Sequence, residues 1–364
     1  MNTYKAAVLG ATGMVGQRFI SLLDEHPWFQ VVAVAASPRS AGKSYREAVG
    51  ERWTMAKPIP SRVADLTVLA VEANLEAIAA EVDVVFCALD MEKEAIRRIE
   101  KAYAAAGVAV ISNNSAHRWT EDVPMIMPEV NPEHAALIHT QRKNRGWTHG
   151  FIAVKPNCSI QSYVSVLTAL KAYRPIDVDV TSLQAISGAG KTFATWPEMV
   201  DNVIPYIGGE EEKSEKEPMK IWGTLADDSV QLAASPTINA TCIRVPVSDG
   251  HMASVRVQFA QPARQEELVA AMQNFSNPLA ELALPSAPKQ LIQYIDDESR
   301  PQTKLDRDYG NGMGVSVGRL RALSEKQWQF IALAHNTVRG AAGGAVLMAE
   351  LLAAKGYIHS RAGK

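Results

Sequence analysis

The stretch Leu9-Gly10-Ala11-Thr12-Gly13-Met14-Val15-Gly16, residues 9–16, decides the fold that we predict for this chain. An apolar run over 6–9 precedes it and apolar residues at helical spacing follow over 19–23, which predicts a strand, a tight turn and a helix. Gly10 allows the sharp turn, Gly13 allows the backbone to approach a pyrophosphate, and the helix directs free N–H groups at the anion. This order favours a dinucleotide site over an ordinary tight turn of an α/β protein.

Apolar runs continue on both sides of a change in texture near residue 154. The earlier runs lie at 31–36, 82–89 and 108–111, with a helical stretch near 92–106. Their alternation predicts a parallel sheet, wound as an α/β Rossmann dinucleotide-binding domain. The later runs lie at 178–186, 241–247, 254–259, 314–320 and 328–333. Their length and spacing predict a mostly antiparallel sheet in a second domain of α+β type.

The chain length agrees with two domains, because 364 residues are about twice the length of a typical domain. We place the Rossmann domain at 1–155 and the second domain at 156–335. A C-terminal helix at 336–364 is expected to pack back on the first domain and complete it.

Composition and charge exclude several classes of protein. The chain is 47% apolar and 21% charged with a net charge of −2, which is typical of a globular protein and leaves no basic stripe for nucleic acid. The longest weakly polar stretch, 340–354, contains Glu350 and is shorter than a membrane span of about 20 residues. The N-terminus lacks the pattern of a secretion signal, so we expect a cytoplasmic protein. Three widely spaced cysteines predict neither a disulfide framework nor a metal site.

The end of the second predicted strand distinguishes between nicotinamide cofactors. NAD-binding domains usually carry an acid there for the ribose hydroxyl, whereas this chain has Ser37-Pro38-Arg39-Ser40. Hydroxyls and a guanidinium suit a 2′-phosphate, so the sequence favours NADP. The alternative is that Arg39 is an ordinary solvated loop residue.

Cys158 differs from the other two cysteines in its local pattern. Cys87 and Cys242 lie within strand-like runs and are expected to be buried small hydrophobic residues. Cys158 follows Pro156-Asn157 at a strand end and precedes a predicted helix, whose N-terminus would lower a thiol pKa and hold an oxyanion. On this pattern alone, a nucleophile and a buried core cysteine remain equal alternatives.

A nucleophilic thiol needs an acid/base partner, and His251 is the candidate. It ends the segment Val247-Ser248-Asp249-Gly250-His251, a predicted turn between two strands, whereas the other histidines lie in polar loops or near proline. Arg244 on the preceding strand is suited to hold a carboxylate through two N–H groups, with a structural ion pair as the alternative.

Jointly these motifs resemble those of the aspartate-semialdehyde dehydrogenase family, in the branch shared by archaea, fungi and some bacteria. The resemblance spans essentially the whole chain. Besides 9–16, it rests on Ser37-Pro38-Arg39-Ser40-Ala41-Gly42, Pro156-Asn157-Cys158-Ser159, Gln184-Ala185-Ile186-Ser187-Gly188-Ala189-Gly190, Arg244-Val245-Pro246-Val247 with Gly250-His251, and Asn336-Thr337-Val338-Arg339-Gly340-Ala341-Ala342. It implies that the α+β domain is catalytic, serves dimerisation, and is like that of glyceraldehyde-3-phosphate dehydrogenase.

The resemblance also implies individual roles. The implied catalytic residues are the nucleophile Cys158, the acid/base His251 and Gln184, which positions the acyl intermediate. The implied substrate-binding residues are Arg244 for the carboxylate, Glu210 near the amine, Arg118 and Lys213 for phosphate, and Asn157 beside them. The implied NADP contacts are Thr12, Gly13, Met14, Val15, Ser37, Arg39, Ser40, Ser187, Gly188 and Asn336.

Two positions stay open within the resemblance. Glu210-Glu211-Glu212 offers three candidate acids, and Glu210 is preferred for its spacing to Lys213. Met252 occupies a position that is often a small hydroxyl residue in the family, which leaves the support of His251 undetermined.

The implied reaction is the NADPH-dependent conversion of β-aspartyl phosphate to aspartate semialdehyde through a Cys158 thioester, in lysine, threonine, methionine and isoleucine biosynthesis. NADP(H), a small-molecule substrate and a homodimer or homotetramer are implied with it, and no metal. The rivals are a reductase of N-acetylglutamyl phosphate or malonyl-CoA and, from another class, a non-catalytic NADP-binding redox sensor. Arg118 and Lys213 favour phosphate over CoA, because a thiol leaving group needs no oxyanion clamp.

Overall fold

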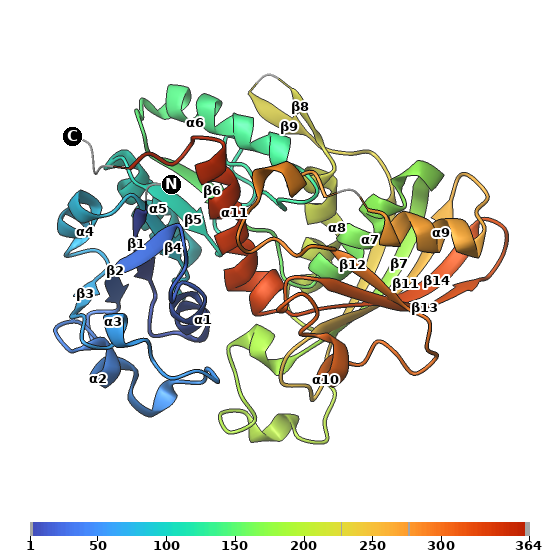
Figure 1. The fold of residues 1–364 in the computed structure, drawn as a ribbon, viewed down its shortest axis with the longest axis horizontal. Helices are drawn as coiled ribbons and strands as arrows, with labels where there is room; N and C mark the ends of the chain where they lie inside the picture. Colours follow the sequence, from blue (N-terminus) through green and yellow to red (C-terminus); the bar gives the residue numbers. More distant parts are fainter. Residues whose placement is uncertain (1–2, 227, 276, 361–364) are drawn as a thin grey trace.

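A computed structural model describes residues 3–226, 228–275 and 277–360. It contains two six-stranded sheets that lie next to each other, with the last helix, α11 (Gly343–Ala354), between them (Figure 1). Across the described ranges, no helix combines the length and apolar character that a membrane crossing requires.

The first sheet is parallel throughout, with the strand order β3-β2-β1-β4-β5-β6. Its strands are β1 (Tyr4–Leu9), β2 (Phe29–Ala36), β3 (Val68–Ala70), β4 (Val84–Cys87), β5 (Ala109–Ser112) and β6 (Phe151–Val154). Its helices are α1 (Met14–Leu22), α2 (Tyr45–Val49), α3 (Ser61–Ala64), α4 (Leu75–Glu81), α5 (Lys93–Ala105) and α6 (Leu137–Arg145). The order reverses between β1 and β4, where doubly wound sheets bind dinucleotides. The Rossmann prediction is confirmed.

Two glycines make the turn between β1 and α1 possible. Gly10 has φ +81°, and a Cβ there would lie 2.3 Å from the carbonyl oxygen of Ala88. A Cβ at Gly16 would lie 2.2 Å from the carbonyl oxygen of Gly10, so α1 packs directly on the turn. At Gly13 the nearest atom to such a Cβ is 3.5 Å away, which leaves the backbone at the start of α1 open to a ligand.

The second sheet is mixed, with the order β10-β7-β11-β14-β13-β12. Its strands are β7 (Pro175–Gln184), β10 (Thr237–Arg244), β11 (His251–Phe259), β12 (Ile292–Ile295), β13 (Val315–Ala322) and β14 (Gln327–Ala334), and a hairpin of β8 (Thr224–Ala226) and β9 (Ser229–Gln231) stands apart. The central pairs are antiparallel as predicted, but both edge pairs, β7 with β10 and β12 with β13, are parallel. The α+β class is confirmed.

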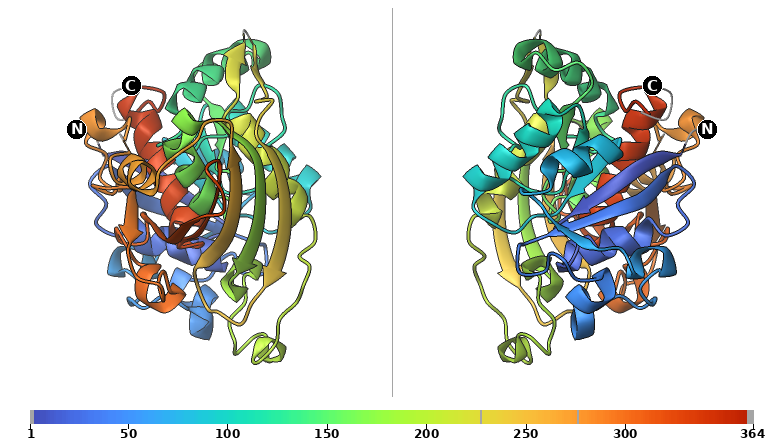
Figure 2. Two further views of the ribbon diagram at one scale, coloured as in Figure 1. Left: turned by 90° about the vertical axis from the view of Figure 1, so that its right-hand side faces the viewer. Right: turned by 90° about the vertical axis from the view of Figure 1, so that its left-hand side faces the viewer.

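One face of the second sheet is covered by helices and the other is open. The helices are α7 (Gln161–Ala169), α8 (Glu210–Ile221), α9 (Gln265–Gln273) and α10 (Thr303–Asp306). α7 packs on β11, β13 and β14, α9 on β12 and β13, and α8 runs beside β10. Along β7, Val178, Val180 and Ser182 are buried, whereas Asp179 and Thr181 on the opposite face are not. Figure 2 shows this uncovered face of the sheet toward the viewer in its left view.

The C-terminal segment returns to the first domain, as expected, but is less helical than predicted. A single π-type turn (Val338–Ala342) precedes α11, and residues 355–360 are not helical. The end of the predicted helix, 361–364, lies outside the described residues. α11 is buried almost all round and packs against β5 and α1, which explains why its sequence is apolar except for Glu350. A domain boundary at 155/156 remains our proposal.

Candidate active site

Cys158 lies in the turn that joins β6 to α7. Asn157 closes this turn, because its Oδ1 accepts the Ser159 N–H at 2.7 Å and the Ser159 hydroxyl at 2.6 Å. The helix begins at Gln161, so the cysteine precedes it, as predicted. The π-type turn lies behind the thiol, where a Cβ at Gly340 would lie 2.9 Å from the Cβ of Cys158. Cys158 is half-buried, and its sulfur is free, as are those of the buried Cys87 and Cys242.

His251 faces the thiol, with its Nε2 3.5 Å from the Cys158 Sγ. The prediction placed His251 in a turn, but it is the first residue of β11 and is 1% exposed. Its Nδ1 accepts the backbone N–H of Ala185 at 3.0 Å. An accepting Nδ1 carries no proton, so the neutral ring holds its proton on Nε2, pointed at the sulfur. Burial, followed by the charge of Arg244, lowers the pKa of His251 to about 3.

The electrostatic setting of Cys158 differs from the predicted one. Burial and the Glu210 carboxylate raise the pKa of the Cys158 thiol above its ordinary value, while Lys155 and Arg118 act in the opposite direction. The expected lowering by a helix N-terminus is therefore wrong for the protein without substrate. Because Glu210 contributes to the rise, any cation that neutralises this carboxylate favours the thiolate.

Glu210, the first residue of α8, is surrounded by hydrogen-bond donors. Asn157 Nδ2 lies 3.1 Å from both of its carboxylate oxygens, Gln184 Nε2 lies 3.4 Å from Oε2, and Lys213 Nζ lies 2.7 Å from Oε1. This cluster joins four of the predicted site residues into one polar wall beside the nucleophile. Gln184 and Asn157 are 1% and 4% exposed, so their amides are fixed in place.

The neighbouring acids of the Glu210-Glu211-Glu212 run face elsewhere. Glu211 Oε1 accepts the backbone N–H of Cys242 at 3.2 Å. Glu212 is exposed and pairs with Lys216 at 2.8 Å on the outer face of α8. Glu210 is thus the acid of the three that lies beside Asn157 and Gln184.

Arg244, at the end of β10, lies close to His251. It is 5% exposed, and its Nη1 donates to the carbonyl of Ala185 at 2.7 Å. A Cβ at Gly188 would lie 2.8 Å from Arg244 Nη1 and 3.0 Å from His251 Nε2. The backbone at Gly188 therefore covers both side chains and admits no larger residue without displacing one of them.

Hydrogen bonds join Asn336 to Ser187, a second predicted cofactor contact, and to the residue that precedes β11. Asn336 Nδ2 donates to Ser187 Oγ at 2.8 Å, and Asn336 Oδ1 accepts the Gly250 N–H at 2.8 Å. Ser187 and Gly188 thereby sit beside the start of β11. Met252 pairs with Leu183 and Leu333 in the sheet, and strand alternation turns it away from the face of His251. The Ala185 amide, not residue 252, supports the imidazole.

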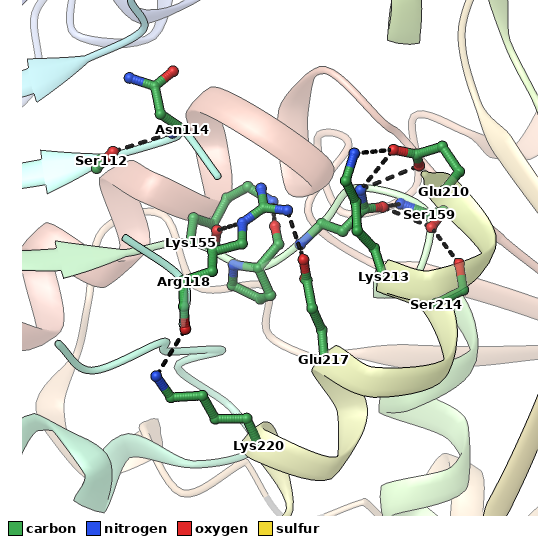
Figure 3. A network of polar contacts seen from close by, with 12 residues as sticks. Ser112, Asn114, Arg118, Lys155, Ser159, Glu210, Lys213, Ser214, Glu217 and Lys220 are labelled. Carbon is green, nitrogen blue, oxygen red and sulfur yellow. Dashed lines mark hydrogen bonds and ion pairs between the residues drawn. The ribbon is translucent and has the colours of Figure 1, made fainter. Parts of the chain in front are cut away.

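Arg118 and Lys213, the predicted phosphate pair, each contact a carboxylate. Arg118 Nη1 donates to Glu217 Oε1 at 2.8 Å and its Nε to the Lys155 carbonyl at 3.1 Å, while Lys213 pairs with Glu210 (Figure 3). Arg118 is 6% exposed. The structure thus brings the two cations to either end of the Asn157 turn.

Three buried residues of this region were missed by the sequence reasoning: Lys155, Glu217 and Lys220 (Figure 3). Burial and the charge of Arg118 lower the pKa of Lys155 to about 7, and its Nζ donates to the Pro156 carbonyl. Glu217 and Lys220 follow Glu210 at spacings of one helical face, which was the available signal. From the sequence alone, however, a helix face with buried charged residues cannot be distinguished from one whose charged residues are in contact with solvent.

The predicted cofactor residues border a separate cavity over the first sheet. Thr12, Gly13 and Ser37 line this space of about 330 Å³, together with residues 70–73 and 88–91. Met14 and Val15 form the first turn of α1 next to it. Arg39 and Ser40 lie on the loop that follows Ser37, with Arg39 exposed. An open helix start, hydroxyls and an exposed guanidinium fit a dinucleotide that carries a 2′-phosphate.

Comparisons with known proteins match nearly the whole chain to proteins of one kind. Residues 5–138 match the family description "Semialdehyde dehydrogenase, NAD binding domain", and residues 167–339 match "Semialdehyde dehydrogenase, dimerisation domain". The aspartate-semialdehyde dehydrogenase of Archaeoglobus fulgidus is 44% identical over 96% of this chain and 98% of its own length. That of Candida albicans is 41% identical over 98% and 100%.

Solved structures give the same result. A crystal structure of aspartate semialdehyde dehydrogenase with NADP from Candida albicans has a TM-score of 0.87 and 40% identity, covering 98% of this chain and 100% of that one. The Vibrio cholerae enzyme II, complexed with ASA, has a TM-score of 0.74 and 27% identity, covering 97% and 99%.

Proposed function

Because this chain belongs to the aspartate-semialdehyde dehydrogenase family, we propose that it reduces β-aspartyl phosphate to aspartate semialdehyde and inorganic phosphate, with NADPH as the reductant. The reaction places it in amino-acid biosynthesis. The observation that supports this proposal best is the arrangement of a half-buried thiol beside His251, with Arg244 and Glu210 on the surrounding walls.

The charges of the site match a free amino acid. Arg244 is the cation for the α-carboxylate, and Glu210 is the anion for the α-ammonium. An N-acetylated substrate has no ammonium group, so the cluster around Glu210 argues against N-acetylglutamyl phosphate. Arg118 and Lys213 favour phosphate over the CoA thiolate as the leaving group. A redox sensor would need none of these substrate contacts.

The covalent step begins with the Cys158 thiolate. Burial and then the Glu210 carboxylate raise the thiol pKa, so an ammonium bound at Glu210 offsets the second of these causes and favours the thiolate. The sulfur attacks the β-acyl carbon, the carbon–oxygen bond to phosphate breaks, and Arg118 and Lys213 hold the departing anion. A thioester on Cys158 remains, and Gln184 is placed to orient it.

Reduction then releases the product from the enzyme. When bound, NADPH would supply the hydride that reduces the thioester carbon. His251 donates its Nε2 hydrogen bond to the sulfur as the carbon–sulfur bond of the hemithioacetal breaks, and the aldehyde leaves. Hydrogen bonds of Asn336 to Ser187 and to the Gly250 N–H hold the cofactor side of the site next to the start of β11.

The test is the reverse reaction. Pure protein is mixed with aspartate semialdehyde, inorganic phosphate and NADP, and NADPH absorbance is followed. We expect turnover that requires phosphate and is abolished by Cys158→Ala, with cofactor binding retained in that variant. Turnover on malonyl-CoA but not in this assay would move the function to the sister reductase, and retained activity in Cys158→Ala would overturn the thioester.

Several finer properties belong to the same proposal. The dimerisation-domain match covers the strands of the second sheet, and the uncovered face of that sheet supports a homodimer through that surface. Light scattering would distinguish this dimer from a homotetramer.

Free thiols at all three cysteines support a cytoplasmic location. Comparing NADP with NAD as substrate tests the role of Ser37, Arg39 and Ser40.

A further inference from the structure

Helix α8 carries charged residues along one face well beyond the predicted substrate contacts. Glu210, Lys213, Glu217 and Lys220 recur at three- and four-residue spacings and project toward the turn of Cys158 and the loop of Arg118 (Figure 3). Glu217 and Lys220 are 1% and 4% exposed. Charged side chains are almost never so deeply buried unless they are paired.

The two oxygens of the Glu217 carboxylate hold two different segments. Oε1 accepts from Arg118 Nη1 at 2.8 Å, and Oε2 accepts the backbone N–H of Asn157 at 2.6 Å. Asn157 immediately precedes the nucleophile. One buried carboxylate therefore joins the phosphate-binding arginine to the turn that carries Cys158.

The rest of Arg118 is fixed by its neighbours. Its Nε donates to the carbonyl of Lys155, which lies in the same turn. Lys220 Nζ donates to the carbonyls of Arg118, Thr120 and Val123 at 2.8, 3.4 and 3.1 Å, which secures the main chain of the loop. Within the described ranges, Nη2 makes no protein hydrogen bond, so that side of the guanidinium is the one presented to a ligand.

We propose that Glu217 is a positioning residue for the proposed reaction: it sets the Arg118 guanidinium against the Cys158 turn, so that Nη2 meets the phosphate as sulfur attacks. This inference rests on the proposed function. It also connects the two ends of the substrate, because the same helix carries Glu210, the residue proposed for the amine, at its first turn.

A purely structural ion pair would also explain the burial of Glu217, and Glu217→Gln separates the two roles. Glutamine has the same shape but one acceptor oxygen, so its amide N–H₂ must face either Arg118 Nη1 or the Asn157 N–H, donor against donor. The Arg118 guanidinium is then no longer held in its orientation against the Cys158 turn. A structural role predicts lower stability without a selective loss of phosphate recognition.

The experiment measures KM for inorganic phosphate in the reverse reaction. For Glu217→Gln we expect this KM to rise by about tenfold to a hundredfold, as for loss of a charged hydrogen bond, with KM for NADP within about twofold of wild type. Glu217→Asp, which keeps both acceptors, should recover part of the loss. Glu212→Gln removes the same charge from the exposed face of α8 and should change neither constant.

A double-mutant cycle with Arg118→Lys decides the route of the effect. If Glu217 acts through Arg118, adding Glu217→Gln to Arg118→Lys should change KM for phosphate by less than about twofold. An equal rise in both backgrounds, or an unchanged phosphate KM in Glu217→Gln, would overturn the inference.

A second readout keeps the result independent of turnover and of the proposed function. Inorganic phosphate should protect Cys158 from iodoacetamide in wild type and less well in Glu217→Gln, with circular dichroism reporting the folded fraction. If the wild-type protein shows no turnover, the proposed function fails. The positioning role of Glu217 is then tested only by how well phosphate protects Cys158 from iodoacetamide. Equal protection in folded Glu217→Gln would refute its positioning role, and Glu217→Asp replaces it if the glutamine variant does not fold.

Discussion

Gly188→Ala is the substitution whose effect follows most directly from the geometry. The added Cβ would lie 2.8 Å from Arg244 Nη1 and 3.0 Å from His251 Cε1 and Nε2. Ordinary contacts lie at about 3.5 Å, so the arginine must retreat by about 0.7 Å and the imidazole by about 0.5 Å. Gly188 lies in a 3-10 turn over Ile186–Ala189 that alanine can adopt, so the backbone itself tolerates the change.

The kinetic cost follows from this displacement. A misplacement of about 1 Å costs about a hundredfold in rate, so we expect kcat/KM for aspartate semialdehyde to fall by about tenfold to a hundredfold. This corresponds to about 1.4 to 2.7 kcal/mol of transition-state stabilisation. Movement of Arg244 would appear in KM for the semialdehyde, and movement of His251 in kcat. KM for phosphate should stay unchanged, because Arg118 is held by Glu217 and Lys155 instead.

The assay compares initial rates of NADPH formation with each substrate varied in turn. Gly208→Ala is the matched control, since no atom lies within 4 Å of the Cβ it would add, and its rates should remain within about twofold of wild type. KM for NADP is measured in parallel, because Gly188 is also a predicted cofactor contact. Near-native kinetics in Gly188→Ala, or a change confined to NADP, would refute the steric argument.

Three further predictions concern charge and protonation. Arg244→Lys should raise KM for aspartate semialdehyde by about tenfold with a smaller change in kcat, because an ammonium cannot reproduce the planar two-pronged contact; an unchanged KM would remove Arg244 from the carboxylate site. Nitrogen-15 NMR should show a neutral His251 protonated at Nε2 from pH 8 to about 5. Since its pKa falls from 6.5 to about 3 on folding, the unfolded state binds more protons in that range, and the free energy of unfolding should decrease as pH falls from about 6.5 toward 3, an effect absent in His251→Gln.

Much of the fold could be predicted because its signals are local. The glycine turn and the apolar runs of the first sheet each lie within a few consecutive residues, and the structure confirms the Rossmann arrangement. β3 was missed because Val68–Ala70 is too short to show a pattern. The parallel edges of the second sheet were missed because strand order depends on contacts between distant segments.

The site was predictable only where a residue sits in a motif. The structure places Cys158, His251, Gln184 and Glu210 close together, and their roles remain proposals. Lys155, Glu217 and Ala185 escaped because nothing in the sequence distinguishes a buried lysine, a buried helix carboxylate or a backbone amide that fixes a tautomer. The thiol pKa was predicted in the wrong direction, because burial and Glu210 act through space rather than along the chain.

The close contact of Gly340 with Cys158 has a consequence for the order in which the site is completed during synthesis on the ribosome. Every proposed catalytic side chain precedes residue 252, yet the turn behind the nucleophile, Val338–Ala342, is translated only after β14. A nascent chain that ends before Gly340 therefore carries these side chains but lacks the turn that packs against the Cβ of Cys158. The segment around Gly340 is thus the last part of the proposed site to leave the ribosome.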